Sequence, residues 1–359
     1  MLTMVIADLY NKHLYLLDSK SVTEFQKTAF EHLAHGNGSI KEVKNSLMLL
    51  TTMMQSYYAK PVILLIDEYD VPVAKANNNG YYNEMLDVMK GLMQALKDNQ
   101  ALRFAVVTGC LKIAKESIFT GTNNFVSDTI TNSRLSEYFG FVQSEVDQLL
   151  KDADLTEQAE NIKKWYDGYY LNRVGHVYSP NSVMEAINNE EFQNYWSQTE
   201  TYESLKVYIE MDFDGLKQRI VEMLGGARIK IEVGSFQNDM TTFHCADDVL
   251  TLLIHLGYLA YDSKTEKAFI PNEEVRSAFV LAIRNRGWDE VYKAIENSEK
   301  LLKATLAMNE TAVAKMLQDV HMQNSSSLVY NNEVSLASII QLAYYLSLIH
   351  ISEPTRRSY

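Results

Sequence analysis

Residues 61–70 read PVILLIDEYD, and the order of apolar and acidic residues in this stretch decides the expected fold. The five apolar residues 62–66 form the kind of run that a strand buried on both faces of a parallel sheet shows. Asp67 and Glu68 follow directly, so both acids are expected at the carboxyl end of that strand, where open α/β sheets bind ligands. A core strand that simply ends in a solvated acidic turn is the alternative reading of these ten residues.

A second apolar run supports a parallel sheet. Residues 102–107 read LRFAVV and precede Thr108, and residues 83–98 between the two runs carry apolar side chains at helical spacing. Strand, helix and strand joined by short links predict a right-handed βαβ unit with two parallel strands. Thr108 is then expected at the same sheet edge as Asp67. The polar residues 74–82, AKANNNGYY, are expected to form a loop.

Two acids at the end of a buried strand are the pattern of the Walker B strand in nucleotide triphosphatases. There, one acid holds Mg²⁺ and the next polarises the attacking water. Asp67 and Glu68 are candidates for these roles, and Thr108 is a candidate for the polar sensor of the γ-phosphate, or else a hydroxyl that caps the turn. Basic residues near this edge would meet phosphates or remain solvated surface charges; they are Lys112, Lys115 and Arg134.

A phosphate-binding loop of the form G-x-x-x-x-G-K-[ST] is expected upstream of such a strand. The glycines that precede Asp67 are Gly36 and Gly38, and no Gly-Lys-Ser/Thr follows them. We therefore expect Met1 to be an internal start or a fragment edge, with the phosphate loop missing. Because that loop supplies most contacts to the β- and γ-phosphates, this chain is expected to bind ATP weakly and to hydrolyse it negligibly.

The composition indicates a globular protein of two or three domains. The chain has 359 residues, 47% of them hydrophobic, and a net charge of −13 from 46 acidic and 33 basic residues. This acidity lowers the expectation of a nucleic-acid-binding face. Apolar stretches fall far short of the roughly 18 residues of a membrane span, no secretory leader is visible, and two cysteines fit a reducing compartment. We therefore expect a cytoplasmic protein without a membrane partner.

The second half of the chain shows a winged-helix pattern. Residues 246–256 have the spacing of an amphipathic helix, residues 258–262 and 268–270 predict a hairpin, and residues 271–284 predict another helix. Winged helices often bind DNA, but the acidic residues here favour packing against the preceding layer, with DNA contact as the alternative. These acids are Asp247, Asp248, Asp262, Glu266, Glu273 and Glu274.

An aromatic-rich stretch lies between the two halves. Residues 165–180 read WYDGYYLNRVGHVYSP, with turn signals at Gly168 and Gly175. The pattern predicts a short hairpin that acts as the hinge between the nucleotide-binding layer and the helical region.

Several motifs together resemble the bacterial AAA-ATPase-like family. They are IDEYD at 66–70, GYYNE at 80–84, ALKDN at 95–99, FAVVTGCLKIAKESIFTGTNN at 104–124, SEYFGF at 136–141 and WYDGYY at 165–170. The resemblance implies a P-loop ATPase core, a winged-helix-like module and a C-terminal PD-(D/E)XK nuclease-like domain, with ATP and Mg²⁺ as ligands. By this resemblance Asp67 is the Mg²⁺ acid, Glu68 the water-activating acid and Thr108 the sensor, and Arg134 is a weaker candidate for a phosphate-facing arginine.

The C-terminal residues depart from the family pattern. Residues 328–345 resemble the first helix of the nuclease-like domain, with Glu333 as its first acid. From Leu346 onward the sequence LSLIHISEPTR resembles a translated sequencing adapter, so we predict no structure or function for residues 346–359. The remaining nuclease acids and lysine are therefore missing from this chain.

The expected fold class is an α/β, P-loop NTPase-like parallel sheet, partial because it lacks the Walker A unit, followed by a mainly α winged-helix-like domain. The expected boundaries are 1–200 for the ATPase-like part, 201–327 for the winged-helix-like part, 328–345 and 346–359. The expected function is that of a fragment of an ATPase coupled to a nuclease-like domain, through which DNA would be a partner. The alternative is a non-catalytic protein-interaction or DNA-tethering module with relic Walker B acids.

Overall fold

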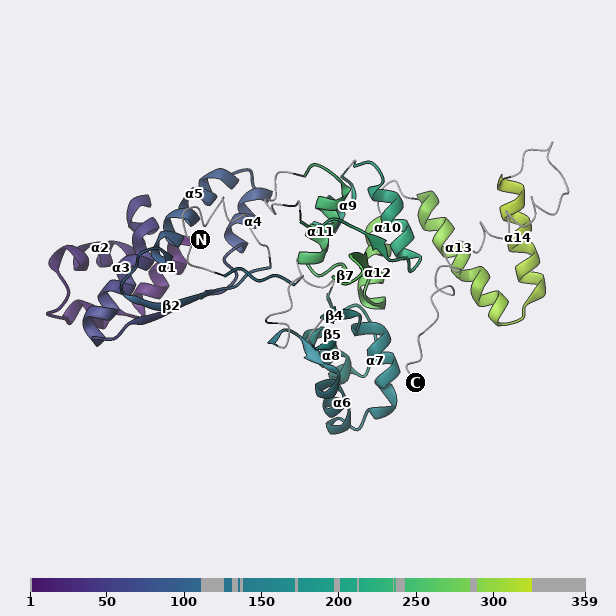
Figure 1. Ribbon diagram of the computed structural model, residues 1–359, viewed down its shortest axis with the longest axis horizontal. Helices are drawn as coiled ribbons and strands as arrows, with labels where there is room; N and C mark the ends of the chain where they lie inside the picture. Colours follow the sequence, from purple (N-terminus) through teal and green to yellow (C-terminus); the bar gives the residue numbers. More distant parts are fainter. Residues whose placement is uncertain are drawn as a thin grey trace. The chain divides into compact units, whose positions relative to one another are not determined.

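The computed structural model describes residues 2–110, 126–130, 135, 138–171, 174–196, 201–211, 213–234, 236, 243–284 and 289–324. The chain forms two compact units, which are drawn in sequence colours in Figure 1. Unit 1 comprises residues 1–127 with 237–243, and unit 2 comprises residues 128–236 with 244–359. The division thus falls at residue 127, whereas the sequence predicts a boundary at residue 200.

Unit 1 begins with helices that start at strong capping signals. Thr23 and Gln26 form a capping box at the start of α2, and Ser39 and Glu42 form another at the start of α3. Ala59 in the left-handed conformation ends α3 just before Pro61 begins the approach to the sheet. The elements are α1 (Leu2–Asn11), the 3₁₀ helix η1 (Leu14–Asp18), α2 (Glu24–Ala34) and α3 (Ile40–Tyr58).

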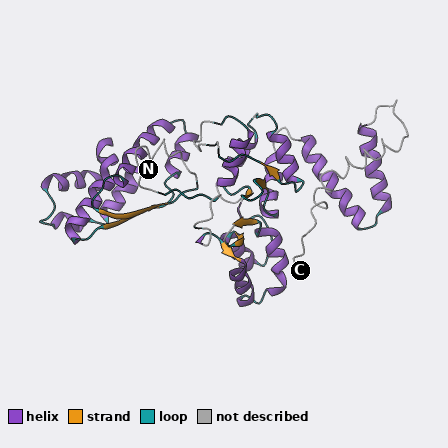
Figure 2. Ribbon diagram, in the orientation of Figure 1, coloured by secondary structure: helices purple, strands orange, loops and turns teal. Residues whose placement is uncertain are grey.

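The two predicted strands of unit 1 form and pair in parallel. They are β1 (Val62–Ile66) and β2 (Leu102–Val107), drawn as orange arrows in Figure 2. In their register Ile63 lies opposite Phe104 and Leu65 opposite Val106. The chain between them forms α4 (Val71–Asn78), α5 (Tyr82–Met93) and the 3₁₀ helix η2 (Gln94–Leu96).

The prediction of a loop over residues 74–82 is wrong for its first half, which belongs to α4. Pro72 lies in the first turn of this helix, where its fixed φ favours helix and its missing N–H costs nothing. Val73 and Ala76 are fully buried, so packing stabilises the helix despite the asparagine run.

The sheet is also less covered than the sequence predicts. In the described structure α3 packs on one face of β1, but the other face is open. Large apolar side chains in cross-strand pairs line this open face; Ile63 is 50%, Leu65 70%, Phe104 49% and Val106 46% exposed. The prediction that β1 is buried on both faces is therefore wrong for the described residues.

The first part of unit 2 packs three helices around a small antiparallel sheet of order β3-β5-β4. Val146, Ile162, Tyr166, Tyr178 and Val183 belong to its buried core. The elements are β3 (Phe141–Val142), α6 (Gln143–Asp152), the 3₁₀ helix η4 (Thr156–Gln158), α7 (Ala159–Tyr166), β4 (Tyr169–Leu171), β5 (Gly175–Tyr178) and α8 (Pro180–Asn189). The hairpin predicted within residues 165–180 is thus confirmed.

The second part of unit 2 is mainly helical and carries a second small sheet of order β6-β8-β7. The predicted helix at 246–256 and the hairpin after it are both present. The elements are α9 (Thr201–Ile209), α10 (Leu216–Leu224), β6 (Ile229–Lys230), α11 (Ala246–His255), β7 (Ala260–Asp262), β8 (Lys267–Phe269), α12 (Glu273–Arg284), α13 (Asp289–Leu306) and α14 (Glu310–Asn324).

The segment predicted to be a hinge lies inside unit 2 and packs closely against later residues of that unit. Gly168 has φ +112°, and a Cβ at this position would lie 1.9 Å from the carbonyl oxygen of Pro271. The Asn272 side-chain amide donates to the carbonyl oxygen of Asp167 at 2.8 Å, and the Tyr169 hydroxyl donates to the carbonyl of Gly257. These contacts join the β4–β5 hairpin to the helices that follow it.

Candidate active site

The carboxyl edge of the β1–β2 sheet brings Asp67 and Thr108 together. The Thr108 N–H donates to the carbonyl of Ile66 at 2.8 Å, and the Tyr69 N–H donates to the carbonyl of Thr108 at 3.1 Å. Backbone pairing therefore continues beyond the last strand residues. The Thr108 hydroxyl donates to Asp67 Oδ1, and both residues are exposed.

Asp67 and Thr108 continue the rows of the open apolar face. Successive side chains of a strand alternate between faces, so Asp67 follows Leu65 and Thr108 follows Val106 on the same side. The polar pair therefore lies at the end of an exposed apolar surface.

Glu68 makes the turn out of the strand. Its φ of +53° lies in the left-handed region, which costs a non-glycine residue about 1 kcal/mol, and such residues often mark functional sites. Its backbone N–H donates to Asp67 Oδ1 at 3.0 Å, so this oxygen accepts two hydrogen bonds from its neighbours. The Glu68 side chain itself is exposed.

The electrostatic environment of this edge is negative. Partial burial raises the pKa of the Cys110 thiol, and the carboxylates of Asp70, Glu68 and Asp67 raise it further because they disfavour a nearby thiolate. The sequence analysis assigned no role to Asp70. This residue is only 3% exposed, whereas Asp67 and Glu68 are exposed. Its place in the same IDEYD motif was the available signal.

The donor set fits a magnesium ion that is shared with phosphate oxygens. Mg²⁺ is usually held by one or two carboxylates, several waters and substrate phosphates. Asp67 offers an exposed carboxylate whose orientation is fixed by Thr108 and the Glu68 backbone. Within the described ranges, no three His, Cys, Asp or Glu side chains gather tightly enough to hold a metal by themselves. The edge could therefore bind Mg²⁺ together with a nucleotide.

Three predicted phosphate-facing residues have no described position. Lys112, Lys115 and Arg134 lie outside the described residues, as does the predicted nuclease acid Glu333. The structure therefore brings together Asp67, Glu68 and Thr108 of the predicted set, and the role of Arg134 stays a prediction.

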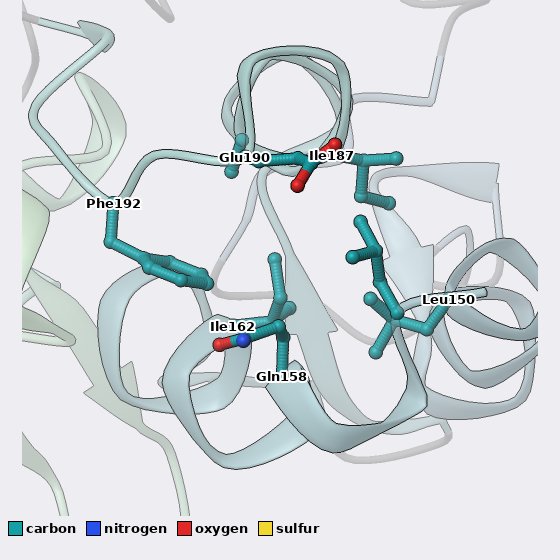
Figure 3. Close-up of a pocket in the computed structure, with 8 residues that line it drawn as sticks. Leu150, Gln158, Ile162, Ile187, Glu190 and Phe192 are labelled. Atoms are coloured by element: carbon teal, nitrogen blue, oxygen red, sulfur yellow. The ribbon is translucent and has the colours of Figure 1, made fainter. Parts of the chain in front are cut away.

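A cavity in unit 2 does not compete with this edge as a nucleotide site. It has a volume of about 60 Å³, and Leu150, Ile162 and Phe192 point into it (Figure 3). Gln158 and Glu190 supply polar atoms among otherwise apolar lining residues. Ligand pockets usually measure about 300 Å³ or more, so this cavity has room for small solvent molecules only.

The helix before the hairpin in unit 2 does not expose a face for DNA. Eight of the ten residues of α11 are buried, whereas a helix that reads the major groove needs an exposed face. Its acids have internal partners: Asp247 pairs with Arg219, and Asp248 accepts from the N–H groups of His244 and Cys245 at 2.7 and 3.3 Å. These contacts are consistent with a helix that serves packing.

Comparisons with known proteins found a family match over residues of unit 1 that include the IDEYD motif. Residues 7–119 match the family described as "Predicted AAA-ATPase", and this range includes Asp67, Glu68 and Thr108. A protein of Azotobacter chroococcum mcd 1, described as "Uncharacterized protein in vnfD 5'region", is 33% identical over 143 residues. The match covers 39% of this chain and 27% of that relative. No solved structure matches the chain.

Helices long and apolar enough to cross a lipid bilayer are absent from the described parts of both units.

Proposed function

We propose that the carboxyl edge of the β1–β2 sheet is the Mg²⁺ side of an ATP-binding site of the P-loop type. The observation that carries the proposal is the hydrogen bond from the Thr108 hydroxyl to Asp67, formed at the exposed ends of two parallel strands. The family match over residues 7–119 supports the same assignment. In this proposal the cytoplasm is the compartment, because ATP is supplied there.

Each residue has a distinct role in this proposal. Asp67 holds Mg²⁺, which when bound neutralises charge on the phosphate oxygens, and Thr108 keeps the Asp67 carboxylate in one orientation. Glu68 accepts a proton from the attacking water, since its exposed carboxylate follows Asp67 directly. Arg134 is a further candidate for contact with phosphate.

The open apolar face is the proposed seat of the phosphate-binding segment. No G-x-x-x-x-G-K-[ST] pattern occurs anywhere in the sequence, and ATP turnover by this mechanism requires one. Parallel sheets are normally covered on both faces, and the uncovered face here leads directly to Asp67 and Thr108. We propose that a strand–helix unit from outside this sequence packs on Ile63, Leu65, Phe104 and Val106.

An ATPase assay tests this proposal with the chain as it exists. In the presence of Mg²⁺ we expect weak binding of fluorescently labelled ATP and no turnover above the rate of an Asp67→Asn variant. Magnesium-dependent turnover by the purified chain, abolished by Asp67→Asn, would contradict the need for an added phosphate loop. Reading the genomic DNA before the Met1 codon gives an independent check: an intact phosphate loop after a predicted strand supports the ATPase.

A second candidate function is a non-catalytic interaction module in which Asp67 and Glu68 are relics. The exposed apolar face of the sheet favours it, since uncovered apolar surface often marks an interaction site. A degraded phosphate loop in the genomic sequence would favour this candidate. Coupling to a PD-(D/E)XK nuclease-like domain, and DNA as its partner, stay proposals that rest on the family resemblance.

The fold assignments are likewise proposals. The parallel pair β1–β2 with α4 and α5 between its strands supports part of a P-loop NTPase-like sheet. In unit 2, α10, β6, α11 and the β7–β8 hairpin follow one another, and β8 pairs with both β6 and β7. This order supports a winged-helix-like module whose helix α11 serves packing.

A further inference from the structure

Asp70 differs from the two acids before it. It is 3% exposed and is the buried charged residue among the described residues of unit 1. It lies at the position before α4, and its carbonyl accepts from the N–H groups of Val73 and Ala74 at 3.0 and 2.9 Å. The backbone of Asp70 therefore begins the helix, while its side chain lies inside the fold, away from solvent.

The Asp70 carboxylate lies against the loop that leaves β2. A Cβ added to Gly109 would lie 2.3 Å from Asp70 Oδ1 and 2.7 to 2.8 Å from the ring of Tyr69. Real Cβ contacts are essentially never this short, so a side chain at position 109 would displace Asp70 or Tyr69. Asp70 and Tyr69 thus pack directly against the middle of the loop formed by residues 108–110.

The packing of Asp70 and Tyr69 against Gly109 is linked to Thr108 through the backbone. Gly109 directly follows Thr108, whose carbonyl accepts from the Tyr69 N–H at 3.1 Å. The Thr108 hydroxyl donates to Asp67 from the start of this loop. A shift of Gly109 away from Asp70 would therefore move the hydroxyl that orients the proposed Mg²⁺ acid.

We propose that Asp70 is a positioning residue that holds the Thr108-Gly109-Cys110 loop, and thereby Thr108, in register with Asp67. This inference rests on the proposed function for its catalytic meaning, but the loop contact itself does not depend on ATP. Asp70 does not bind the cation in this proposal, because the residue is only 3% exposed to solvent.

Hydrogen exchange of the full chain tests the loop contact without nucleotide or metal. Asp70→Asn should raise exchange about tenfold in peptides that cover Tyr69 and residues 104–110, with other peptides of unit 1 unchanged. Asp87→Asn, at an exposed acid of α5, is the matched control and should leave this segment unchanged. Gly109→Ala keeps the charge of Asp70 and should show the same local loss of protection, which covers the case in which Asp70→Asn does not fold. Wild-type exchange rates in either variant would overturn the proposal.

A double-mutant cycle with Mn²⁺ alone separates positioning from metal binding. We expect Asp70→Asn and Thr108→Val each to weaken Mn²⁺ binding about threefold or more, and the double variant to bind no more weakly than Thr108→Val. Independent, multiplicative losses would show that Asp70 acts on the cation by a route other than Thr108 and would overturn the positioning role. If the wild-type chain binds no Mn²⁺, the proposed Mg²⁺ site fails, while the exchange experiment still decides the role of Asp70.

Discussion

Two motif segments of this protein differ in the environment of their first acids. IDEYD at 66–70 presents Asp67 and Glu68 to solvent at the end of a strand, with a short local hydrogen-bond set. In WYDGYY at 165–170, Asp167 is buried inside unit 2, and its Oδ2 lies 2.9 Å from His176 Nδ1. Both segments combine acids with tyrosine, but Asp67 remains accessible to a ligand whereas Asp167 is enclosed by the fold.

The difference lies in what each acid bonds. Glu274 in α12 of the same unit is 1% exposed and accepts hydrogen bonds from the N–H groups of Tyr195 and Trp196 at 2.9 and 3.1 Å. Buried carboxylates of this kind stabilise the fold by satisfying backbone donors that would otherwise be unpaired. Exposed carboxylates at a strand end contribute little to stability.

The largest expected effect is that of Gly168→Ala. The added Cβ would lie 1.9 Å from the Pro271 carbonyl oxygen, so we expect the free energy of unfolding of unit 2 to fall by more than about 3 kcal/mol. Gly175→Ala is the matched control, because its φ is also positive but nothing lies within 4 Å of the added atom; we expect a loss of about 1 kcal/mol. All three tryptophans, Trp165, Trp196 and Trp288, belong to unit 2, so urea unfolding followed by tryptophan fluorescence reports on this unit. Equal losses in the two variants would refute the close contact.

Removal of the Glu274 side chain should have the next largest effect. Glu274→Ala leaves the N–H groups of Tyr195 and Trp196 without their acceptor, and we expect a loss of about 2–4 kcal/mol in the same urea experiment. Glu68→Gln is the comparison in unit 1, where we expect a change within about 0.5 kcal/mol of the overall free energy of unfolding. A loss of similar size at Glu68 would mean that the exposed acids also stabilise the fold.

A smaller contrast is expected between neighbouring leucines of β1. Leu64 points to the covered face of the sheet and Leu65 to the open face, where it is 70% exposed. We expect Leu64→Ala to destabilise unit 1 by about 1–2 kcal/mol and Leu65→Ala by less than about 0.5 kcal/mol, as measured by hydrogen exchange of the β1 and β2 amides. If Leu65→Ala costs as much as Leu64→Ala, the face is covered in solution.

The smallest effect is a pH dependence at Glu274. Burial raises the pKa of its carboxyl above the ordinary value, although hydrogen bonds from Ser182 and two backbone amides oppose the shift. A raised pKa in the folded state means that stability is highest while the group is protonated and falls as the pH rises through the folded pKa. We therefore expect Glu274→Gln to gain stability relative to the wild type as the pH rises from the ordinary glutamate pKa through the raised pKa of the folded state, measured by urea unfolding at each pH. A difference that does not change with pH would show that Glu274 titrates normally.

The sequence predicts much of the secondary structure around the site. An apolar run that ends in Asp67 and a second run that ends in Thr108 are local signals, and both strands and their parallel pairing follow from them. The close approach of Asp70 to Gly109 was not predictable, because these residues come together only after the strands have paired. Likewise, the close approach of Gly168 to Pro271 joins residues far apart in the chain, so the turn signal predicted the hairpin but not its packing.

The open face shows a limit of periodicity arguments. Continuous apolar residues indicate that both faces of β1 suit burial, and they do not say which element covers each face. In the described structure, α3 covers one face and the other remains exposed. The same sequence pattern therefore predicted coverage of both faces, whereas the described residues cover one.

The most direct test of the central claim is to locate Mn²⁺ on the chain by paramagnetic broadening of backbone amide signals. If Asp67 is the metal-binding acid, substoichiometric Mn²⁺ should broaden the amide signals of Glu68, Thr108 and Gly109 first, and Asp67→Asn should abolish this broadening. Early broadening that is confined to other acidic stretches, or that persists in Asp67→Asn, would contradict the assignment of this sheet edge as the Mg²⁺ side of a nucleotide site.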